Sequence, residues 1–317
     1  MLVAILYTGS LRTIEKTFLH LKRNLLIHGD VHIYACLEND TSMSDEEWNI
    51  KLFHELEGNI KSIVWKSNKK YSDWQIVKHI NVENINTHIH WAKKYLLDSG
   101  SMFEHYQMQH AYKAMVQKEY ETGVNYEYVI RCRTDTIFCK PIDFHWLHYT
   151  DEQLAQIIAT IRSKLPAIKD IMPHLLYGIM HEDILGNIQN IEANCKPSES
   201  YREIKEDSVS EINEYIKNGK YMLCIRSNLL YICKRSLFHL IPLLGTSYGL
   251  LQNPYTDEYW WNSESQFESI CYHAGLTTFN YNTEYEGKSI YQFDRNLFFD
   301  ENNEVREKSQ LYCLVRN

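Results

Sequence analysis

The chain opens with a regular exchange between apolar runs and amphipathic segments. Residues 11–26 repeat apolar positions at helical spacing. The apolar runs around this segment and beyond it, each short enough for a buried strand, cover residues 2–7, 31–36 and 60–65. A strand, a helix and a strand in this order predict parallel pairing through a right-handed crossover.

The alternation of strands and helices covers the first half of the chain, and the order is mixed after it. Lys140-Pro141 breaks the alternation, and Thr150-Asp-Glu-Gln153 has the form of a capping box, so we expect a mainly helical insertion over 141–220. The other expected elements are helices over 102–120, 236–244 and 263–274, a strand from 126, one strand or a strand pair within 221–233, and a strand over 276–282. Together they predict one α/β domain spanning 1–317, with a mostly parallel central sheet.

The strand from residue 126 carries the most unusual polar residues. Its sequence is apolar enough for burial, yet Arg131, Arg133 and Asp135 share one side because side chains alternate along a strand. Such charges are expected at the carboxyl end of a strand in an open α/β sheet, where ligands bind. Asp135 is then a candidate ligand for a divalent cation, and the arginines are candidates for phosphate. An ion pair between Arg133 and Asp135 explains the same residues without a ligand.

Composition narrows the classes of function. The net charge of -8 argues against a dedicated nucleic-acid-binding protein. The eight cysteines form no Cys-x-x-Cys pair and no zinc-spaced group, which favours a reducing compartment without structural disulfides. No apolar run reaches the length of a membrane span, and the first residues lack a signal-peptide pattern. We therefore expect a cytoplasmic protein without a membrane span, in a host cytoplasm or a virion if the chain is viral.

The turn expected at Thr8–Ser10, after the first strand, is a candidate anion site. A helix that starts there would point its free N–H groups at the turn, and Arg12 would grip a diphosphate with two hydrogen bonds. The segment lacks both the glycine fingerprint of dinucleotide folds and the lysine of a P-loop. A plain strand-to-helix turn therefore stays open as the alternative.

Two further segments carry candidate chemistry. Asp257 and Glu264 precede or open a predicted helix, whose dipole favours their ionised form, although helix capping and an exposed turn explain them equally well. The helix over 102–120 carries a polar group formed by Glu104, Tyr106, Gln107 and His110. In that group, a core-facing tyrosine and a partly buried histidine are the simpler interpretation.

Three of these segments together resemble a known family. They are Ala4-Ile-Leu-Tyr-Thr-Gly-Ser-Leu-Arg-Thr13, Met102-Phe-Glu-His-Tyr-Gln107 with Tyr128-Val-Ile-Arg-Cys-Arg-Thr-Asp135, and Asn262-Ser-Glu-Ser-Gln-Phe267. They are similar to viral and bacterial WavE-type lipopolysaccharide-synthesis proteins and, more broadly, to GT-A glycosyltransferases. The resemblance covers residues 1–40, 100–140 and 220–282 in part, and the stretch after Pro141 matches nothing.

The resemblance implies a GT-A-like α/β/α sandwich in which 1–140 binds a nucleotide sugar and 221–317 lies on the acceptor side. It implies a UDP-sugar in preference to a GDP-sugar, a glycan or other hydroxyl acceptor, and Mn²⁺ or Mg²⁺ bound by Asp135. The family's Asp-x-Asp falls on Arg133-Thr-Asp135, so its first acid is an arginine here. The donor-binding residues implied are Thr8, Gly9, Ser10, Arg12, Tyr106, Gln107, Arg131 and Arg133.

The catalytic base is the least defined part of this expectation. Glu264 or Asp257 would deprotonate the acceptor hydroxyl in an inverting transfer, and a retaining transfer is equally open. Two other functions also fit the sequence. One is a sugar nucleotidyltransferase, which would consume a nucleoside triphosphate and a sugar phosphate. The other is a catalytically inactive carbohydrate-binding or scaffold protein.

Overall fold

The structure is a computed structural model. It describes residues 2–26, 30–56, 58–84, 90–98, 100, 102–138, 221–226, 230–246, 263–274, 276–280, 284–285, 288–289 and 312–314. The insertion expected over 141–220, with the helix expected to begin at its capping box, lies outside these residues, and so does Asp257.

Seven strands of the described residues form one sheet, in the order β3-β2-β1-β4-β7-β6-β8. Their bounds are β1 (Val3–Ser10), β2 (Val31–Glu38), β3 (Ile60–Trp65), β4 (Tyr128–Arg133), β6 (Tyr221–Arg226), β7 (Leu230–Lys234) and β8 (Thr277–Asn280). β1 pairs in parallel with β2 and β4, and β2 with β3. β7 is antiparallel to both of its neighbours, whereas β6 and β8 are parallel to each other. The sheet is therefore mostly parallel, as predicted.

Two small sheets accompany the main one. β5 (Thr136–Phe138) follows β4 after a two-residue turn and pairs antiparallel with β11 (Tyr312–Leu314), close to the end of the chain. β9 (Glu284–Tyr285) and β10 (Lys288–Ser289) form the other. The pairing of β5 with β11 joins the turn after β4 to the last described residues.

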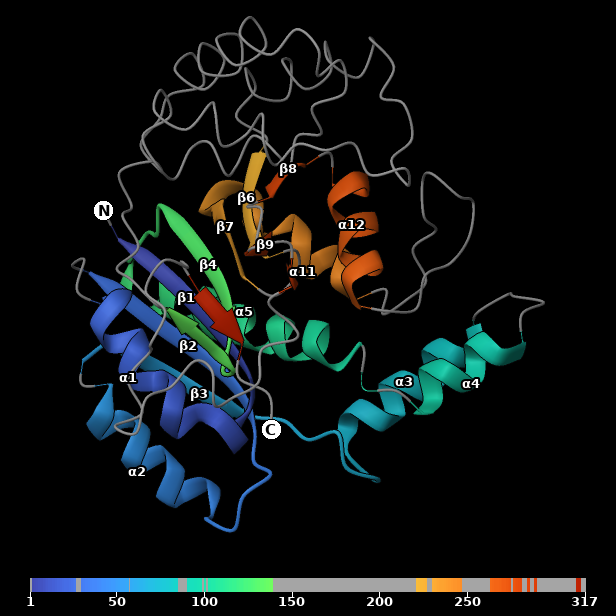
Figure 1. The fold of residues 1–317 in the computed structure, drawn as a ribbon, viewed down its shortest axis with the longest axis horizontal. Coiled ribbons are helices and arrows are strands. Elements are labelled where there is room, and N and C mark those ends of the chain that lie inside the picture. The colour runs from blue at the N-terminus through green and yellow to red at the C-terminus, as the bar shows by residue number, and fades with distance from the viewer. Residues whose placement is uncertain are drawn as a thin grey trace, which may run out of the picture.

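Helices lie on both faces of the main sheet. The helices of the described residues are α1 (Ile14–Asn24), α2 (Asp45–Glu55), α3 (Asp73–Asn84), α4 (His90–Asp98), α5 (Phe103–Thr122), α10 (Arg235–Phe238), α11 (Leu240–Gly245) and α12 (Ser263–His273), and Figure 1 shows α3 and α4 to the side of the sheet. Figure 1 shows α1 and α2 in front of one face and α5 behind the other. Met108, Ala111 and Met115 of α5 pack with Ala4 and Leu6 of β1. In the described part of the chain, no helix combines the length and the apolar character needed to cross a bilayer.

The end of β1 differs from the expected turn. Gly9 and Ser10 keep their register with Leu37 and Glu38 of β2, so the strand continues through Ser10. The helix expected from residue 11 begins as the 3-10 turn η1 (Leu11–Thr13), and α-helical geometry starts with α1. Gly9 allows the extension, because its φ of +141° is a conformation that other residues rarely adopt. The predicted turn at Thr8–Ser10 was wrong, and the chain turns in η1 instead.

Candidate functional site

The carboxyl ends of β1 and β4 meet where the order of the sheet reverses. The chain runs outward from β1 through β2 to β3, and then returns to place β4 on the other side of β1. In open α/β sheets, ligands bind at such a switch point, outside the carboxyl ends of the strands. Thr8 and Arg133 are register partners in the two strands. The segment 8–12 and the charged residues at the end of β4 therefore flank the same point, as the sequence predicts.

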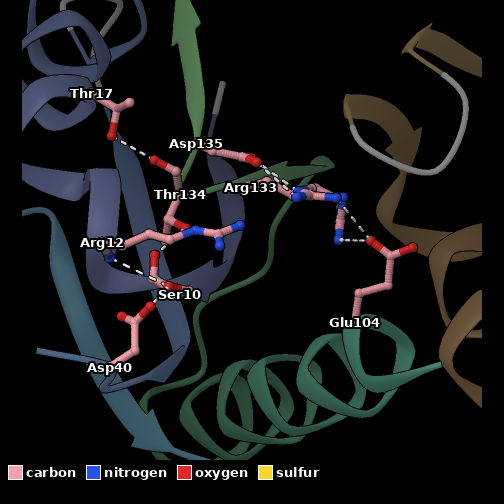
Figure 2. A network of polar contacts seen from close by, with 9 residues as sticks. Ser10, Arg12, Thr17, Asp40, Glu104, Arg133, Thr134 and Asp135 are labelled. Carbon is pink, nitrogen blue, oxygen red and sulfur yellow. Dashed lines mark hydrogen bonds and ion pairs between the residues drawn. The ribbon is translucent and has the colours of Figure 1, made fainter. Parts of the chain in front are cut away.

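Thr134 joins the two strand ends directly. Its backbone N–H donates to the carbonyl oxygen of Thr8 (2.9 Å), and its hydroxyl donates to the carbonyl oxygen of Ser10 (2.7 Å). The Thr17 hydroxyl of α1 donates in turn to the carbonyl oxygen of Thr134 (2.5 Å) (Figure 2). A Cβ on Gly9 would lie 2.3 Å from the Thr134 hydroxyl oxygen, so only glycine allows this approach. Three hydrogen bonds to backbone carbonyl oxygens thus fix this edge of the site.

A network of four charged side chains runs along this edge: Arg131, Glu104, Arg133 and Asp135 (Figure 2). Arg133 donates from Nε to Asp135 Oδ1 (2.9 Å) and from Nη2 to Asp135 Oδ2 (2.7 Å). Glu104 Oε2 lies 3.2 Å from Arg131 Nη2 and 3.7 Å from Arg133 Nη1. The side chain of Arg133 is 26% exposed, whereas that of Asp135 is 8% and that of Arg131 2% exposed. Arg133 is therefore the member of the network most open to solvent.

The network explains how a core strand carries two arginines. The buried guanidinium of Arg131 and the partly exposed one of Arg133 each face a carboxylate, so the formal charges of the four side chains balance. Burial acts to raise the pKa of Glu104, but the positive charges of Arg131 and Arg133 outweigh it and hold that pKa below its ordinary value. Glu104 is therefore ionised at neutral pH.

The first turns of α5 close the site from the side. Glu104 and Gln107 lie three residues apart and so share one face of this helix. Gln107 Nε2 donates to the carbonyl oxygen of Gly9 (3.3 Å), which holds α5 against the end of β1. His105 Nε2 lies 3.2 Å from the carbonyl oxygen of Ser263, the first residue of α12. Glu264 follows Ser263 in this helix, although its side chain lies outside the described residues.

Polar groups beyond β1 and β2 extend the edge. Ser10 donates from its hydroxyl to Asp40 Oδ2 (2.5 Å), which follows β2, and accepts from the backbone N–H of Arg12 (3.3 Å). The Arg12 side chain is exposed, and Figure 2 shows it directed toward the side on which Arg133 lies. The Thr8 hydroxyl is buried without a hydrogen-bond partner among the described residues. Asp40 was not among the predicted site residues, although a polar residue just after a parallel strand is a signal for such a role.

Tyr106 lies in a different environment from Gln107. It is buried in a cluster with Trp74 of α3 and Phe103, with ring centroids 5.2 Å and 6.2 Å away. Its ring also makes an edge contact with His110 (4.6 Å). The structure thus gives Tyr106 the core-facing role that was the simpler interpretation. Its expected contact with a donor finds no support in this geometry.

The residues around Asp135 do not fit a divalent cation in their present arrangement. Both carboxylate oxygens of Asp135 accept hydrogen bonds from Arg133, and Glu104 faces two arginines. A cation needs several oxygen ligands, and one carboxylate already paired with a guanidinium does not supply them. Within the described ranges, no group of three or more His, Cys, Asp or Glu side chains lies close enough to hold a metal ion. The arginine in the first position of the Asp-x-Asp motif therefore puts a positive charge, paired with Asp135, where the family has a carboxylate.

Comparison with known proteins adds no assignment. No protein-family model matches the chain, and no curated protein matches it significantly. The chemistry of the site therefore has to follow from its own residues. These are the two arginines of β4 and the end of β1, which meet at the switch point of a mostly parallel sheet.

Proposed function

We propose that the chain transfers a sugar from a nucleotide-sugar donor to a hydroxyl group of a glycan or similar acceptor. The observation that carries this proposal is the meeting of Arg133 with the Thr8–Arg12 segment at the switch point of the sheet. A nucleotide sugar has a diphosphate whose negative charge must be held, and whose charge grows as the sugar–phosphate bond breaks. The specific GT-A architecture belongs to this proposal, and the mostly parallel α/β sheet is compatible with it.

The donor lies over the carboxyl ends of β1 and β2 in this proposal. Gly9 and Ser10 bring backbone close to the diphosphate, and Arg12 and Arg133 provide two guanidinium groups for its oxygens. Asp40 is placed to accept hydrogen bonds from a donor hydroxyl, since Ser10 already holds its carboxylate at this edge. Preorganised charge of this kind favours the leaving diphosphate without further rearrangement.

The acceptor side is formed by the start of α12. Ser263 contacts His105 of α5, so the first turn of α12 lies at the same end of the sheet as the charged network. A carboxylate in the first turn of a helix is favoured in its ionised form by the helix dipole. Glu264 is in that position and would accept the proton of the acceptor hydroxyl in an inverting transfer. Asp257 remains the second candidate for this role.

The test is donor turnover by the purified chain. UDP- and GDP-sugars are incubated with the protein, and release of the nucleoside diphosphate is followed with and without glycan acceptors. We expect turnover of one donor, and a decrease of about a hundredfold in kcat for Arg133→Gln, because a charge opposite the leaving group is lost. Lys118→Gln removes an exposed charge at the other end of α5 and is the matched control.

A catalytically inactive binding protein is the second candidate, and the pairing of Asp135 with Arg133 favours it. A site in which Arg131, Arg133, Glu104 and Asp135 already pair with one another can recognise a ligand without turning it over. Stoichiometric binding of a nucleotide sugar with no release of nucleoside diphosphate, with or without acceptor, would support this function and contradict the transferase. Consumption of nucleoside triphosphate with sugar phosphate would indicate a nucleotidyltransferase instead.

A further inference from the structure

We infer that the guanidinium of Arg133 takes the place of a metal ion, so that this chain binds a nucleoside diphosphate group without a divalent cation. The inference rests on the proposed function, because it concerns the same diphosphate. It departs from the metal dependence that the resemblance implies. Three features of the site carry it.

The first feature is the occupation of Asp135. Two charge-assisted hydrogen bonds, of 2.9 and 2.7 Å, join its two oxygens to Nε and Nη2 of Arg133 in the parallel arrangement that guanidinium and carboxylate groups favour. A cation on this carboxylate would have to displace the guanidinium. It would also bring a second positive charge beside Arg133, which is unfavourable in a site of low exposure.

The second feature is the fixed position of Arg133. Asp135 holds one edge of its guanidinium, and Glu104 lies 3.7 Å from Nη1 on another side. Glu104 is itself held by Arg131, which is almost completely buried. A group restrained in this way keeps its orientation before a ligand arrives, which is the requirement for electrostatic preorganisation. Arginine is also charged at every physiological pH, as a metal ion is.

The third feature is the position of the positive charge relative to the strand ends. Arg133 is the register partner of Thr8, and Thr134 binds the backbone of Thr8 and Ser10. The exposed Arg12 follows two residues after Ser10. Arg12 adds a third guanidinium to this edge, where the carboxylates of Glu104, Asp135 and Asp40 balance the three arginines. A diphosphate bridging Arg12 and Arg133 would be held by hydrogen bonds from two guanidinium groups, without a net positive charge at the edge.

The experiment is a titration of the full chain with UDP and with GDP by isothermal titration calorimetry, first in excess EDTA and then in excess Mn²⁺. We expect one nucleotide to bind in both conditions, with Kd values that agree within about twofold. Arg133→Gln should weaken binding in EDTA by about tenfold or more, since hydrogen bonds to charged groups contribute about that much. Arg133→Lys keeps the charge but loses the planar fork, and should give an intermediate Kd.

The outcomes separate the inference from the proposed function. Binding only with Mn²⁺ would overturn the inference and leave the transferase standing, whereas no binding in either condition would overturn both. Equal Kd values for Arg133→Gln and wild type would also overturn the inference. Arg12→Gln provides a second test, because its exposed side chain can be changed without disturbing the buried network, and Lys118→Gln is the matched control.

Discussion

Gly9 and Thr134 show how one missing side chain shapes the candidate site. The Thr134 hydroxyl reaches the carbonyl oxygen of Ser10 only because no Cβ stands at position 9. Gly9 also has a φ of +141°, and with this conformation β1 continues beyond the expected turn. The sequence shows the glycine but not its contact, since Thr134 is far away along the chain. A glycine between a threonine and a serine looks like an ordinary turn until the partner strand is known.

Gly9→Ala is expected to destabilise the protein by about 1–3 kcal/mol, because it combines backbone strain with a collision against Thr134. The free energy of unfolding is measured by urea titration. Gly123→Ala is the matched control, since Gly123 also has positive φ (+70°) but has nothing within 4 Å of the added Cβ. The double variant Gly9→Ala with Thr134→Ala should recover part of the loss. Equal losses for the two single glycine variants would show that the contact with Thr134 does not matter.

Glu104 is the residue whose charge should be visible in the pH dependence of stability. Its pKa in the folded protein lies below the ordinary value of 4.5, because Arg131 and Arg133 outweigh the effect of burial. In acid the unfolded state therefore binds the proton more readily. The stabilising contribution of Glu104 is complete above the ordinary value and is lost as the pH falls through the lower, folded value.

We expect the free energy of unfolding of Glu104→Gln to depend less steeply on pH than that of wild type in this acidic range. The variant should also be less stable by about 3–5 kcal/mol at neutral pH, because the buried Arg131 loses its partner. Urea titrations at a series of pH values give both quantities. Glu121→Gln, which changes an exposed carboxylate near the end of α5, is the control for the removal of a carboxylate from this helix. Parallel curves for Glu104→Gln and wild type would refute the assignment.

At the scale of elements, the long periodic segments were predicted well and the short or mixed ones were not. The first three strands, α5, α12 and the strand pair β6–β7 lie where their apolar patterns indicate. The segment 68–90 was not assigned, yet it contains α3, whose Trp74 packs on α5. Aromatic and polar residues alternate there without a clear period, so only the tertiary contact identifies the buried face. α4 and β5 were missed because each is short.

α2 was also missed, although its start carries a local signal. Ser44 accepts from the backbone N–H of Glu47 (3.2 Å), and Glu47 accepts from the backbone N–H of Ser44 (2.7 Å), which is a complete capping box. Ser44→Ala should therefore lower the free energy of unfolding by about 1 kcal/mol, whereas Ser44→Gly should cost only a few tenths. Thermal and urea unfolding of the two variants check this order. A Ser44→Ala variant as stable as wild type would show that the capping box does not contribute to stability.

At the scale of the whole molecule, the predicted residues at the ends of β1 and β4 lie side by side, and Arg133 pairs with Asp135. Alternation along β4 correctly placed Arg131 and Arg133 on one side, and the parallel topology brought them to the end of β1. The pairing of Arg133 with Asp135 was an open alternative, and the structure contains it. The sequence could not show that Glu104 completes the network, because a contact across 27 positions depends on how α5 is set against the sheet.

An ion pair between Glu119 and Arg235 connects the part of the chain before residue 141 with the part after residue 220. Arg235, at the start of α10, donates to both carboxylate oxygens of Glu119 in α5 (2.8 and 2.6 Å), and its backbone N–H donates to the carbonyl oxygen of Glu127. Both side chains are mostly buried. Arg235→Leu should lower the free energy of unfolding by about 3 kcal/mol, because Glu119 would keep its charge without a partner.

The measurement for Arg235→Leu is urea unfolding followed by two probes, circular dichroism and tryptophan fluorescence. If the pair couples the halves, the two probes should separate in the variant and coincide in wild type. Glu119→Gln with Arg235→Leu removes both charges and should recover part of the lost stability. A variant as stable as wild type would show that the β4–β7 pairing holds the halves together by itself.

The charged network has a consequence for how new specificities can arise. Its four members all lie between positions 104 and 135, whereas α12 and the strands β6 to β8 come from beyond position 220. In the proposed function, the part that would hold the anion and the part that would select the acceptor are thus separate stretches of chain, in contact through Ser263 and His105. Recombination between related genes downstream of β4 could exchange one without rewriting the other. Under the proposed function, a single crossover would then join a new acceptor side to an inherited donor site.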